Sequence, residues 1–300
     1  MRKTRLIASL SVAAAALLAL TACNSASPGD SGTAGGSAGK KPWTVATDVS
    51  ITGSPTFDRI TKAGRVTVGV KEDQPGMGYL DTTTGKRSGF DIDVARWMAA
   101  SLGYDADKID FKPIASANRE QAIVNGDIDY YVGTYSITDE RKKQISFAGP
   151  YFVTGQGLLV AKDDGTITGK DALTANDVVC SATGSTSIQR IKAETPAKTK
   201  EYDTYSTCVE DLKNGQVDAV TTDQAILIGY AAQDPDTLKV VGDPFSEERY
   251  GIGLARGDRA LEAAFDKTLT DGHDIWQQIF DDNLGASGIK AAQPEVDQAD

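Results

Sequence analysis

Small donors and a single arginine are grouped in residues 133–151, which read GTYSITDERKKQISFAGPY. Thr134 and Ser136 carry hydroxyl groups, and Arg141 follows in the first turn of a helix expected to begin at Thr138. A helix N-terminus and a guanidinium fork both bind carboxylates well. The segment therefore predicts a carboxylate-binding site, and a surface turn with a solvated basic run is the alternative.

The sequence offers little for nucleophilic or metal chemistry. His273 is the only histidine, so a catalytic triad would have to be built around it, and no Cys-x-x-Cys pair occurs. Asp91 and Asp93 could form a carboxylate pair, but their place at a predicted helix start favours interaction with the helix dipole. Asp223 and Glu72 remain as candidates for a general acid. We predict no enzymatic activity, no metal and no cofactor.

The composition is that of a folded, acidic protein. Of the 300 residues, 40% are apolar and 24% are charged, and the formal net charge is −11. This charge disfavours a nucleic-acid partner, and no basic stretch with interleaved aromatic residues occurs. The length suits one large domain or two of ordinary size.

The first residues have the pattern of an export signal. Three basic residues precede an apolar run at 6–20, which is too short to cross a membrane comfortably. The run ends in Leu-Thr-Ala before Cys23, which resembles the lipobox of bacterial lipoproteins. We therefore expect removal of residues 1–22 and lipidation of Cys23, with palmitate, so that lipid alone holds the protein on the outer side of the cell membrane. A plain secretory signal with an incidental cysteine is the alternative.

Two cysteines then remain, Cys180 and Cys208. An exported protein with two remaining cysteines is expected to pair them, and two buried free thiols are the alternative. Closing a loop of this length contributes about 3.6 kcal/mol to stability in the chain-entropy description.

Strand and helix patterns alternate twice along the chain, which predicts two α/β lobes. The first series has strands at 65–70, 109–114 and 128–132, and the second has strands at 177–180, 217–223 and 237–241. Strand-like runs at 151–160 and 250–254 connect the two series and predict a hinged fold with a ligand cleft. The predicted boundaries are a tether at 23–54, lobe 1 at 55–152 plus 250–285, lobe 2 at 153–249 and a disordered tail at 286–300.

Several motifs within residues 65–284 resemble those of the family 3 extracellular solute-binding proteins, the polar-amino-acid receptors of ABC importers. They are GFDIDVA at 89–95, NGDID at 125–129, YSIT at 135–138 with Arg141 and Phe147, and GPY at 149–151. The resemblance implies a two-lobed, periplasmic-binding-protein-like clamshell of type II with two hinge strands.

Further motifs resemble the glutamate-binding lipoproteins of that family. They are VKEDQPG at 70–76, CSATGST at 180–186, YDTYSTC at 202–208 and YGIGL at 250–254. In that subgroup the two matched cysteines form a disulfide, so the resemblance implies a bond between Cys180 and Cys208.

The resemblance also assigns a role to individual residues. Arg141 matches the arginine that pairs with the α-carboxylate of the ligand, and Thr134 and Ser136 match neighbouring donors. Asp223 matches the acid that accepts hydrogen bonds from the ligand ammonium. A loop of the second lobe closes on the same carboxylate and comprises Gly184, Ser185 and Thr186.

Selectivity is expected from a second group of residues. Ser116 and Arg119 resemble the side-chain-carboxylate site of acidic-amino-acid receptors, although Arg119 could instead be a helix-surface residue. Lys71 lies where receptors of basic amino acids tend to carry an acid, and a cation there would attract an acidic ligand and repel a basic one.

These residues predict a monomeric receptor that delivers L-glutamate to an ABC permease with a cytoplasmic ATPase. The alternatives are the same role for glutamine, aspartate, cystine or another polar amino acid and, more remotely, a dehydratase or lytic enzyme on the same fold.

Overall fold

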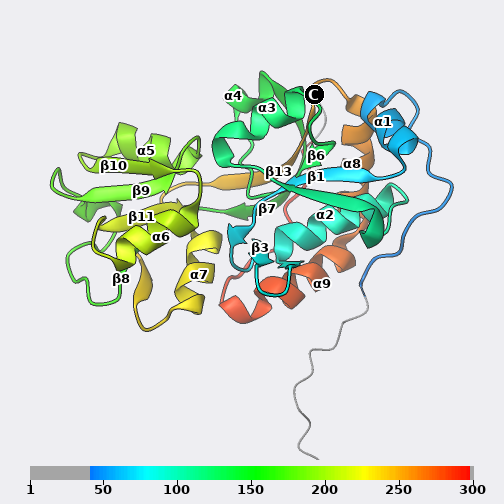
Figure 1. Cartoon of the computed structure of the whole chain (residues 1–300). Helices are drawn as coiled ribbons and strands as arrows, with labels where there is room; N and C mark the ends of the chain where they lie inside the picture. The colour runs from blue at the N-terminus through cyan, green and yellow to red at the C-terminus, as the bar shows by residue number, and fades with distance from the viewer. Residues whose placement is uncertain (1–40, 298–300) are drawn as a thin grey trace, which may run out of the picture. The chain divides into compact units, whose positions relative to one another are not determined.

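Two five-stranded sheets form the centres of two lobes in the computed structural model (Figure 1). The structure describes residues 41–297. The predicted signal segment 1–22, Cys23 and the tether up to residue 40 lie outside the described residues. The α/β fold, with two lobes joined by two connecting segments, is the one predicted from the sequence.

The sheet of lobe 1 has the order β5-β1-β6-β13-β7, in which β5, β1 and β6 are parallel and β13 is antiparallel to both of its neighbours. Its strands are β1 (Val66–Val70), β5 (Ile109–Pro113), β6 (Tyr130–Tyr131), β7 (Ile145–Thr154) and β13 (Glu248–Ala255). Its helices are α1 (Pro55–Ala63), α2 (Phe90–Ser101), α3 (Arg119–Val124), α4 (Asp139–Lys142), α8 (Arg259–Asp271) and α9 (His273–Leu284).

Lobe 2 repeats this arrangement with the order β10-β9-β11-β8-β12, in which β10, β9 and β11 are parallel. Its strands are β8 (Gln156–Ala161), β9 (Val178–Ala182), β10 (Lys198–Tyr202), β11 (Ala219–Asp223) and β12 (Leu238–Val241). Its helices are α5 (Thr186–Glu194), α6 (Tyr205–Lys213) and α7 (Gln224–Gln233). A disulfide joins Cys180 of β9 to Cys208 of α6 with 5.5 Å between the Cα atoms, which confirms the predicted pairing.

A small antiparallel sheet follows β1, in a region where no strand was predicted from the sequence. It consists of β2 (Asp73–Gln74), β3 (Gly78–Asp81) and β4 (Lys86–Ser88). The strands are too short to show a period of two in the sequence. The sheet matters for the site because it fixes the segment that follows Lys71.

The core of lobe 1 is an aromatic cluster around the start of α2. Phe90 packs against Phe152 with 5.2 Å between ring centroids and against Trp276 at 5.7 Å. The indole nitrogen of Trp276 donates to the carbonyl oxygen of Tyr151 at 2.7 Å. The region 259–284 breaks into two helices at Gly272, where a Cβ atom would lie 2.1 Å from the ring of Trp97.

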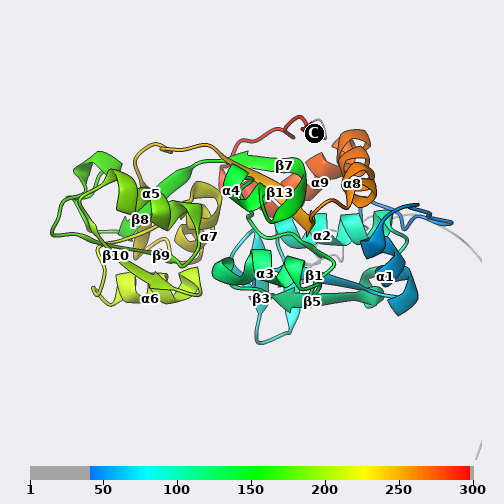
Figure 2. The ribbon, with the colours of Figure 1, turned by 90° about the horizontal axis from the view of Figure 1, so that it is seen from above.

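The two lobes are joined at the ends of β7 and β13, which run side by side (Figure 2). The predicted continuous strand at 151–160 is instead two strands, because β7 ends at Thr154 and β8 begins at Gln156 in the other sheet. On the return path Glu248 pairs with Thr154. Each connection is therefore a short non-strand segment next to a paired end.

Residues at both ends of the described chain are more ordered than the sequence predicted. Residues 41–54, assigned to the flexible tether, pack on lobe 1, where the backbone N–H of Ala46 donates to the carbonyl oxygen of Ala100 at 2.9 Å. Residues 286–297, assigned to a disordered tail, return to lobe 1, where the Asp297 N–H donates to the Gly149 oxygen at 2.9 Å. Scattered apolar side chains provide this packing without any periodic pattern, and they are Trp43, Val49, Ile51, Ile289, Ala291 and Val296.

Between residues 41 and 297 no helix combines the length and the apolar content that a membrane crossing requires. Across the same residues, no group of three or more His, Cys, Asp or Glu side chains is placed to hold a metal ion.

Candidate functional site

The residues proposed from the sequence lie at the carboxyl ends of the parallel strands of both sheets. Lys71 follows β1, Thr134 follows β6 and Asp223 ends β11. In open α/β sheets this edge is where ligands bind. The structure thus brings residues from distant parts of the chain to one region between the lobes.

Two arginines of lobe 1 share one aromatic ring. The guanidinium carbon of Arg119 lies 4.3 Å from the ring centroid of Tyr135, and that of Arg141 lies 4.8 Å from it. Both arginines are buried, with 3% and 8% of their surface exposed. Arg119 is therefore not a helix-surface residue. The ring of Tyr135 stabilises two like charges that would otherwise repel each other.

The guanidinium groups donate mainly to backbone carbonyls. Arg141 donates to the carbonyls of Ser136 and Gly184 at 2.7 and 3.2 Å, and its Nε forms an ion pair with Glu120 at 3.1 Å. Arg119 donates to the carbonyls of Ser116, Thr134 and Gly184 at 3.0, 3.4 and 3.5 Å. Neutral carbonyls hold Arg119 in place without neutralising its charge, which leaves this cation able to bind an anion, whereas the charge of Arg141 is partly compensated by Glu120.

Lys71 and Ser116 form a contact at the end of the same sheet. The Lys71 ammonium donates to the Ser116 hydroxyl at 2.8 Å, and the lysine is only 4% exposed. Burial, reinforced by the charge of Arg119, lowers the pKa of Lys71 to about 7. The three residues expected to recognise the ligand side chain thus contact one another through Ser116.

Thr134 adopts a backbone conformation that is rare for its type. Its φ is 47°, in the left-handed region that β-branched residues avoid. The Asp91 carboxylate holds it there, accepting from the Thr134 N–H at 2.8 Å and from the Tyr151 hydroxyl at 2.8 Å. The Thr134 hydroxyl donates to the Gln74 side-chain oxygen at 3.1 Å. The strain is located at the candidate site, as is common for functional positions.

Asp91 consequently has a structural role that the sequence did not reveal. It is fully buried, and burial raises its pKa to about 7. The sequence suggested either acid–base chemistry or interaction with the helix dipole. The structure places Asp91 in the first turn of α2, as the helix-dipole interpretation requires, and shows in addition that Asp91 positions Thr134 in the site and connects it to Tyr151 on β7.

The second-lobe loop is arranged around the N-terminus of α5. Ser185 is the N-cap, and its hydroxyl accepts from the Ile188 N–H at 3.1 Å. The Thr186 hydroxyl donates to Glu248 at 3.1 Å. Both side chains are engaged, so the groups that this loop can offer an anion are the backbone N–H groups of the helix start. Gly184 has φ 77°, and a Cβ there would lie 2.8 Å from the Cα of Ala117 in lobe 1.

Asp223 presents an unsatisfied acceptor. One carboxylate oxygen accepts from the Tyr250 hydroxyl at 2.6 Å, while the other is buried and has no hydrogen-bond partner. Burial, together with the charge of Glu248, raises the pKa of Asp223 to about 7. An unpaired buried acceptor is costly, which makes this oxygen a strong site for a ligand donor.

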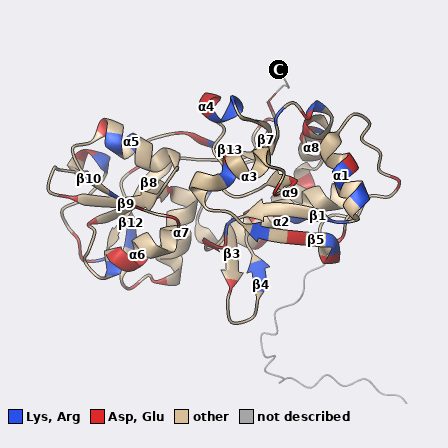
Figure 3. Cartoon of the chain, turned by 45° about the horizontal axis from the view of Figure 1, so that its top comes forward, with Lys and Arg blue, Asp and Glu red and all other residues tan. Residues whose placement is uncertain are grey.

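The charge of the site contrasts with that of the surface. Arg119 and Arg141 interact electrostatically with Asp223, Arg141 pairs with Glu120, and Lys71 is a third buried basic residue nearby. Acidic and basic residues alternate along the ribbon of both lobes (Figure 3), and the chain as a whole is acidic. The cations of the site are therefore a local arrangement and not part of a basic surface. Interactions within such a cleft outweigh surface charges that salt screens within about 10 Å.

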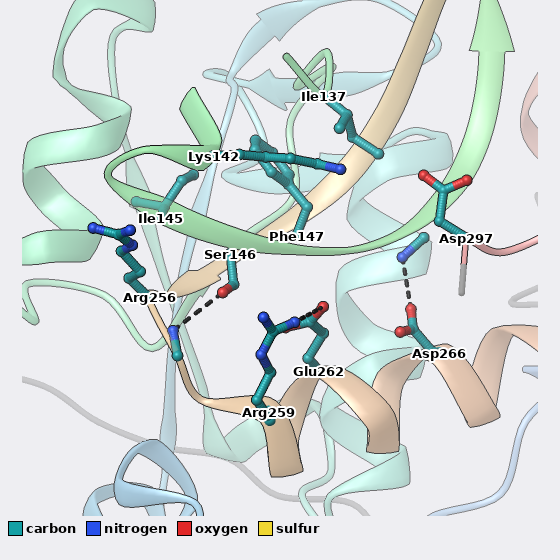
Figure 4. Close-up of a pocket in the computed structure, with 12 residues that line it drawn as sticks. Ile137, Lys142, Ile145, Ser146, Phe147, Arg256, Arg259, Glu262, Asp266 and Asp297 are labelled. Atoms are coloured by element: carbon teal, nitrogen blue, oxygen red, sulfur yellow. Dashed lines mark hydrogen bonds and ion pairs between the residues drawn. The ribbon is translucent and has the colours of Figure 1, made fainter. Parts of the chain in front are cut away.

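Two cavities adjoin this region. One, with a volume of about 530 Å³, lies between the lobes and is lined by Arg141 and the α5 start. Another, of about 220 Å³, lies within lobe 1 between β7 and α8 (Figure 4). Its wall contains Lys142, Arg256 and Asp266, and Asp266 accepts from the Gly149 N–H at 2.7 Å. None of the ligand-binding residues predicted from the sequence lines this second cavity.

Several residues of the site had no signal of their own in the sequence. Tyr135, Gln74, Glu120 and Tyr250 act through contacts between distant segments. Tyr135, Gln74 and Tyr250 lie within motifs that resemble the family, but nothing in those motifs indicated these contacts.

The fold and this cleft define a class of protein. Two α/β lobes meet at the carboxyl ends of their parallel strands, and buried charged groups from both lobes converge there, as in a binding protein that encloses a small polar solute. A sequence model of the bacterial extracellular solute-binding proteins, family 3, matches residues 66–282. The chain belongs to this family of solute-binding proteins.

Individual relatives agree with this assignment. The chain is 38% identical over 296 residues to the glutamate-binding protein GluB of Corynebacterium efficiens, with 94% of this chain and 91% of the relative covered. It is 41% identical over 248 residues to a glutamine-binding protein of Geobacillus stearothermophilus, with coverages of 82% and 92%. The solved structure of an ancestral arginine-binding protein bound to arginine is 35% identical, with a TM-score of 0.69 and coverages of 74% and 99%.

Proposed function

We propose that this protein is a lipid-anchored extracytoplasmic receptor that binds L-glutamate between its lobes and delivers it to an ABC permease. The observation that carries the proposal is the charge pattern of the cleft, where three buried cations accompany one carboxylate with an unsatisfied oxygen. A zwitterionic amino acid with a second carboxylate complements this pattern group by group.

Each charged group of the ligand has a counterpart. The unsatisfied oxygen of Asp223 accepts from the ammonium. Arg141 and the backbone N–H groups at the start of α5 bind the α-carboxylate, with Thr134 and Ser136 beside them. Arg119, Lys71 and Ser116 bind the γ-carboxylate.

Selectivity follows from the cost of leaving a buried charge without its partner. That cost is about 3–5 kcal/mol, which is on the order of 10²–10³-fold in affinity. A neutral glutamine side chain would leave the charges of Arg119 and Lys71 uncompensated. Aspartate would place its carboxylate one methylene short of the same cations.

The transport role rests on the family and on the N-terminal sequence. Family 3 solute-binding proteins give the amino-acid receptor role, and the pattern before Cys23 supports lipid attachment. A closed, ligand-bound form is the state that a permease would recognise. Palmitate labelling that is lost on Cys23→Ser would test the anchor.

Glutamine is a second candidate ligand, and one observation favours it. Because the pKa of Lys71 is lowered to about 7, a substantial share of its amine is neutral near that pH and can accept a hydrogen bond from a side-chain amide. The relative from Geobacillus stearothermophilus is a glutamine-binding protein.

Calorimetric competition between the two ligands tests the proposal. We expect L-glutamate to bind at least 10²-fold more tightly than L-glutamine and L-aspartate at pH 7. Tighter binding of glutamine would assign the second function instead. Absence of heat with every amino acid would refute the receptor role.

A further inference from the structure

A carboxylate of lobe 1 caps a helix of lobe 2. The Asp73 side chain accepts from the backbone N–H groups of Tyr205 and Ser206 at 2.8 and 3.2 Å. These two residues form the first turn of α6, a nine-residue helix. Asp73 belongs to β2 in the small sheet of lobe 1, so both hydrogen bonds cross between the lobes.

The helix has no side-chain cap of its own. Its N-cap residue is Thr204, whose side chain accepts no hydrogen bond from the helix backbone and instead contacts the hydroxyls of Ser206 and Thr207. The first N–H groups of a helix have no partner within the helix and carry a partial positive charge. Asp73 supplies the acceptor and the negative charge that Thr204 does not.

A second contact reinforces the first. The Tyr230 hydroxyl on α7 donates to the backbone carbonyl oxygen of Asp73, and its oxygen lies 3.4 Å from the Asp73 carboxylate. One residue of lobe 1 is thus held by two helices of lobe 2. None of these atoms is among those assigned to ligand binding.

We propose that Asp73 is an interlobe latch, which stabilises the closed form by capping α6 from the opposite lobe. The inference rests on the receptor role proposed above. It adds a contact between the two lobes to the contacts with the ligand that stabilise the closed form. The apparent dissociation constant of a ligand equals its intrinsic value divided by the fraction of protein in the competent state. A latch that raises the closed fraction therefore tightens binding of every ligand by one common factor.

This common factor separates a latch from a ligand-reading residue. Loss of Arg119 should alter the preference among ligands, whereas loss of Asp73 should weaken all of them equally. The disulfide from Cys208 of α6 to β9 fixes the capped helix to the sheet of lobe 2, so the contact acts on the lobe as a whole.

The test compares Asp73→Ala and Asp73→Asn with Asp107→Ala. Asp107 is an exposed acid of lobe 1 that pairs with its neighbour Lys108, so the control removes the same charge without touching lobe 2. Calorimetry should show that Asp73→Ala lowers the affinity for glutamate and for glutamine by the same factor, about tenfold to a hundredfold. Asp73→Asn, which keeps a neutral acceptor, should lose less.

Small-angle X-ray scattering of the ligand-free protein gives an independent measurement. If no amino acid binds, the receptor proposal fails, and the latch is then tested by scattering alone. A larger radius of gyration for Asp73→Ala than for Asp107→Ala supports the latch, and equal radii overturn it. Where ligands bind, equal affinities of Asp73→Ala and Asp107→Ala overturn the latch, as does a loss confined to one ligand.

Discussion

Replacing Arg119 by alanine should change which amino acid the protein prefers. The side chain is 3% exposed and makes hydrogen bonds to three backbone carbonyls. Its guanidinium carbon lies 4.3 Å from the ring centroid of Tyr135. These three acceptors are neutral carbonyls, so its charge is available to the ligand.

The expected magnitude differs between the two ligands. A γ-carboxylate that loses this buried cation loses about 3–5 kcal/mol, or on the order of 10²–10³-fold in affinity. A glutamine amide loses a neutral hydrogen bond worth about 0.5–1.5 kcal/mol, or roughly threefold to tenfold. The preference for glutamate over glutamine should therefore fall by about one to two orders of magnitude.

Isothermal titration calorimetry with both ligands measures this change. Arg65→Ala is the matched control, because Arg65 is an exposed arginine of lobe 1 that pairs with Asp110. Thermal unfolding of each variant shows whether the loss of three carbonyl contacts has destabilised the fold. Equal losses for glutamate and glutamine in Arg119→Ala would refute the assignment of Arg119 to the ligand side chain.

Three further predictions follow from the same geometry. Gly229→Ala should lower the affinity for all ligands alike, because its Cβ would lie 2.0 Å from the Pro75 carbonyl oxygen. The closed lobes would have to part by about 1.3 Å to restore an ordinary carbon–oxygen contact. Unchanged calorimetric affinities would mean that α7 does not contact Pro75 in the bound state. Glutamate affinity should fall on both sides of pH 7, because burial brings the pKa values of Asp223 and Lys71 to about 7. Below pH 7 Asp223 gains a proton and no longer accepts from the ammonium as an anion, and above pH 7 Lys71 loses its proton. In a pH titration of affinity, Asp223→Asn should remove the acid limb and Lys71→Met the alkaline limb, and a flat profile in the unmodified protein would contradict both assignments. Arg141→Lys should weaken glutamate, glutamine and aspartate together by tenfold or more, because a point charge cannot replace a planar fork, and retention of wild-type dissociation constants would remove Arg141 from the α-carboxylate site.

The sequence predicted the parts of the fold that have a strong periodic signal. The α/β alternation, the helix start at Asp91 and Asp93 and the pairing of Cys180 with Cys208 agree with the structure. The small sheet β2-β3-β4 and the packing of residues 286–297 did not emerge, because short strands and scattered apolar contacts leave no period to detect.

The residues of the candidate site also fall into those that the sequence could predict and those that it could not. Residues at the ends of predicted strands, such as Lys71 and Asp223, could be proposed because strand ends gather at one edge of a sheet. The contacts of Asp91 with Thr134 and of Asp73 with α6 join segments far apart in sequence. Such contacts depend on how the lobes close and on one strained backbone angle, neither of which a local pattern encodes.

The pairing of β7 with β13 makes lobe 2 an insertion in a lobe that is otherwise continuous. Thr154 lies opposite Glu248 in the antiparallel register, so the chain leaves lobe 1 and returns to it at neighbouring positions. A tight turn could replace residues 155–247 and reconnect the two strands as a hairpin. Lobe 1 retains Lys71, Arg119 and Arg141, whereas Asp223 and Gly184 lie within the segment removed. The excised protein would be an autonomous half-receptor that holds the cations without the enclosing wall, and it offers a direct way to separate recognition from enclosure.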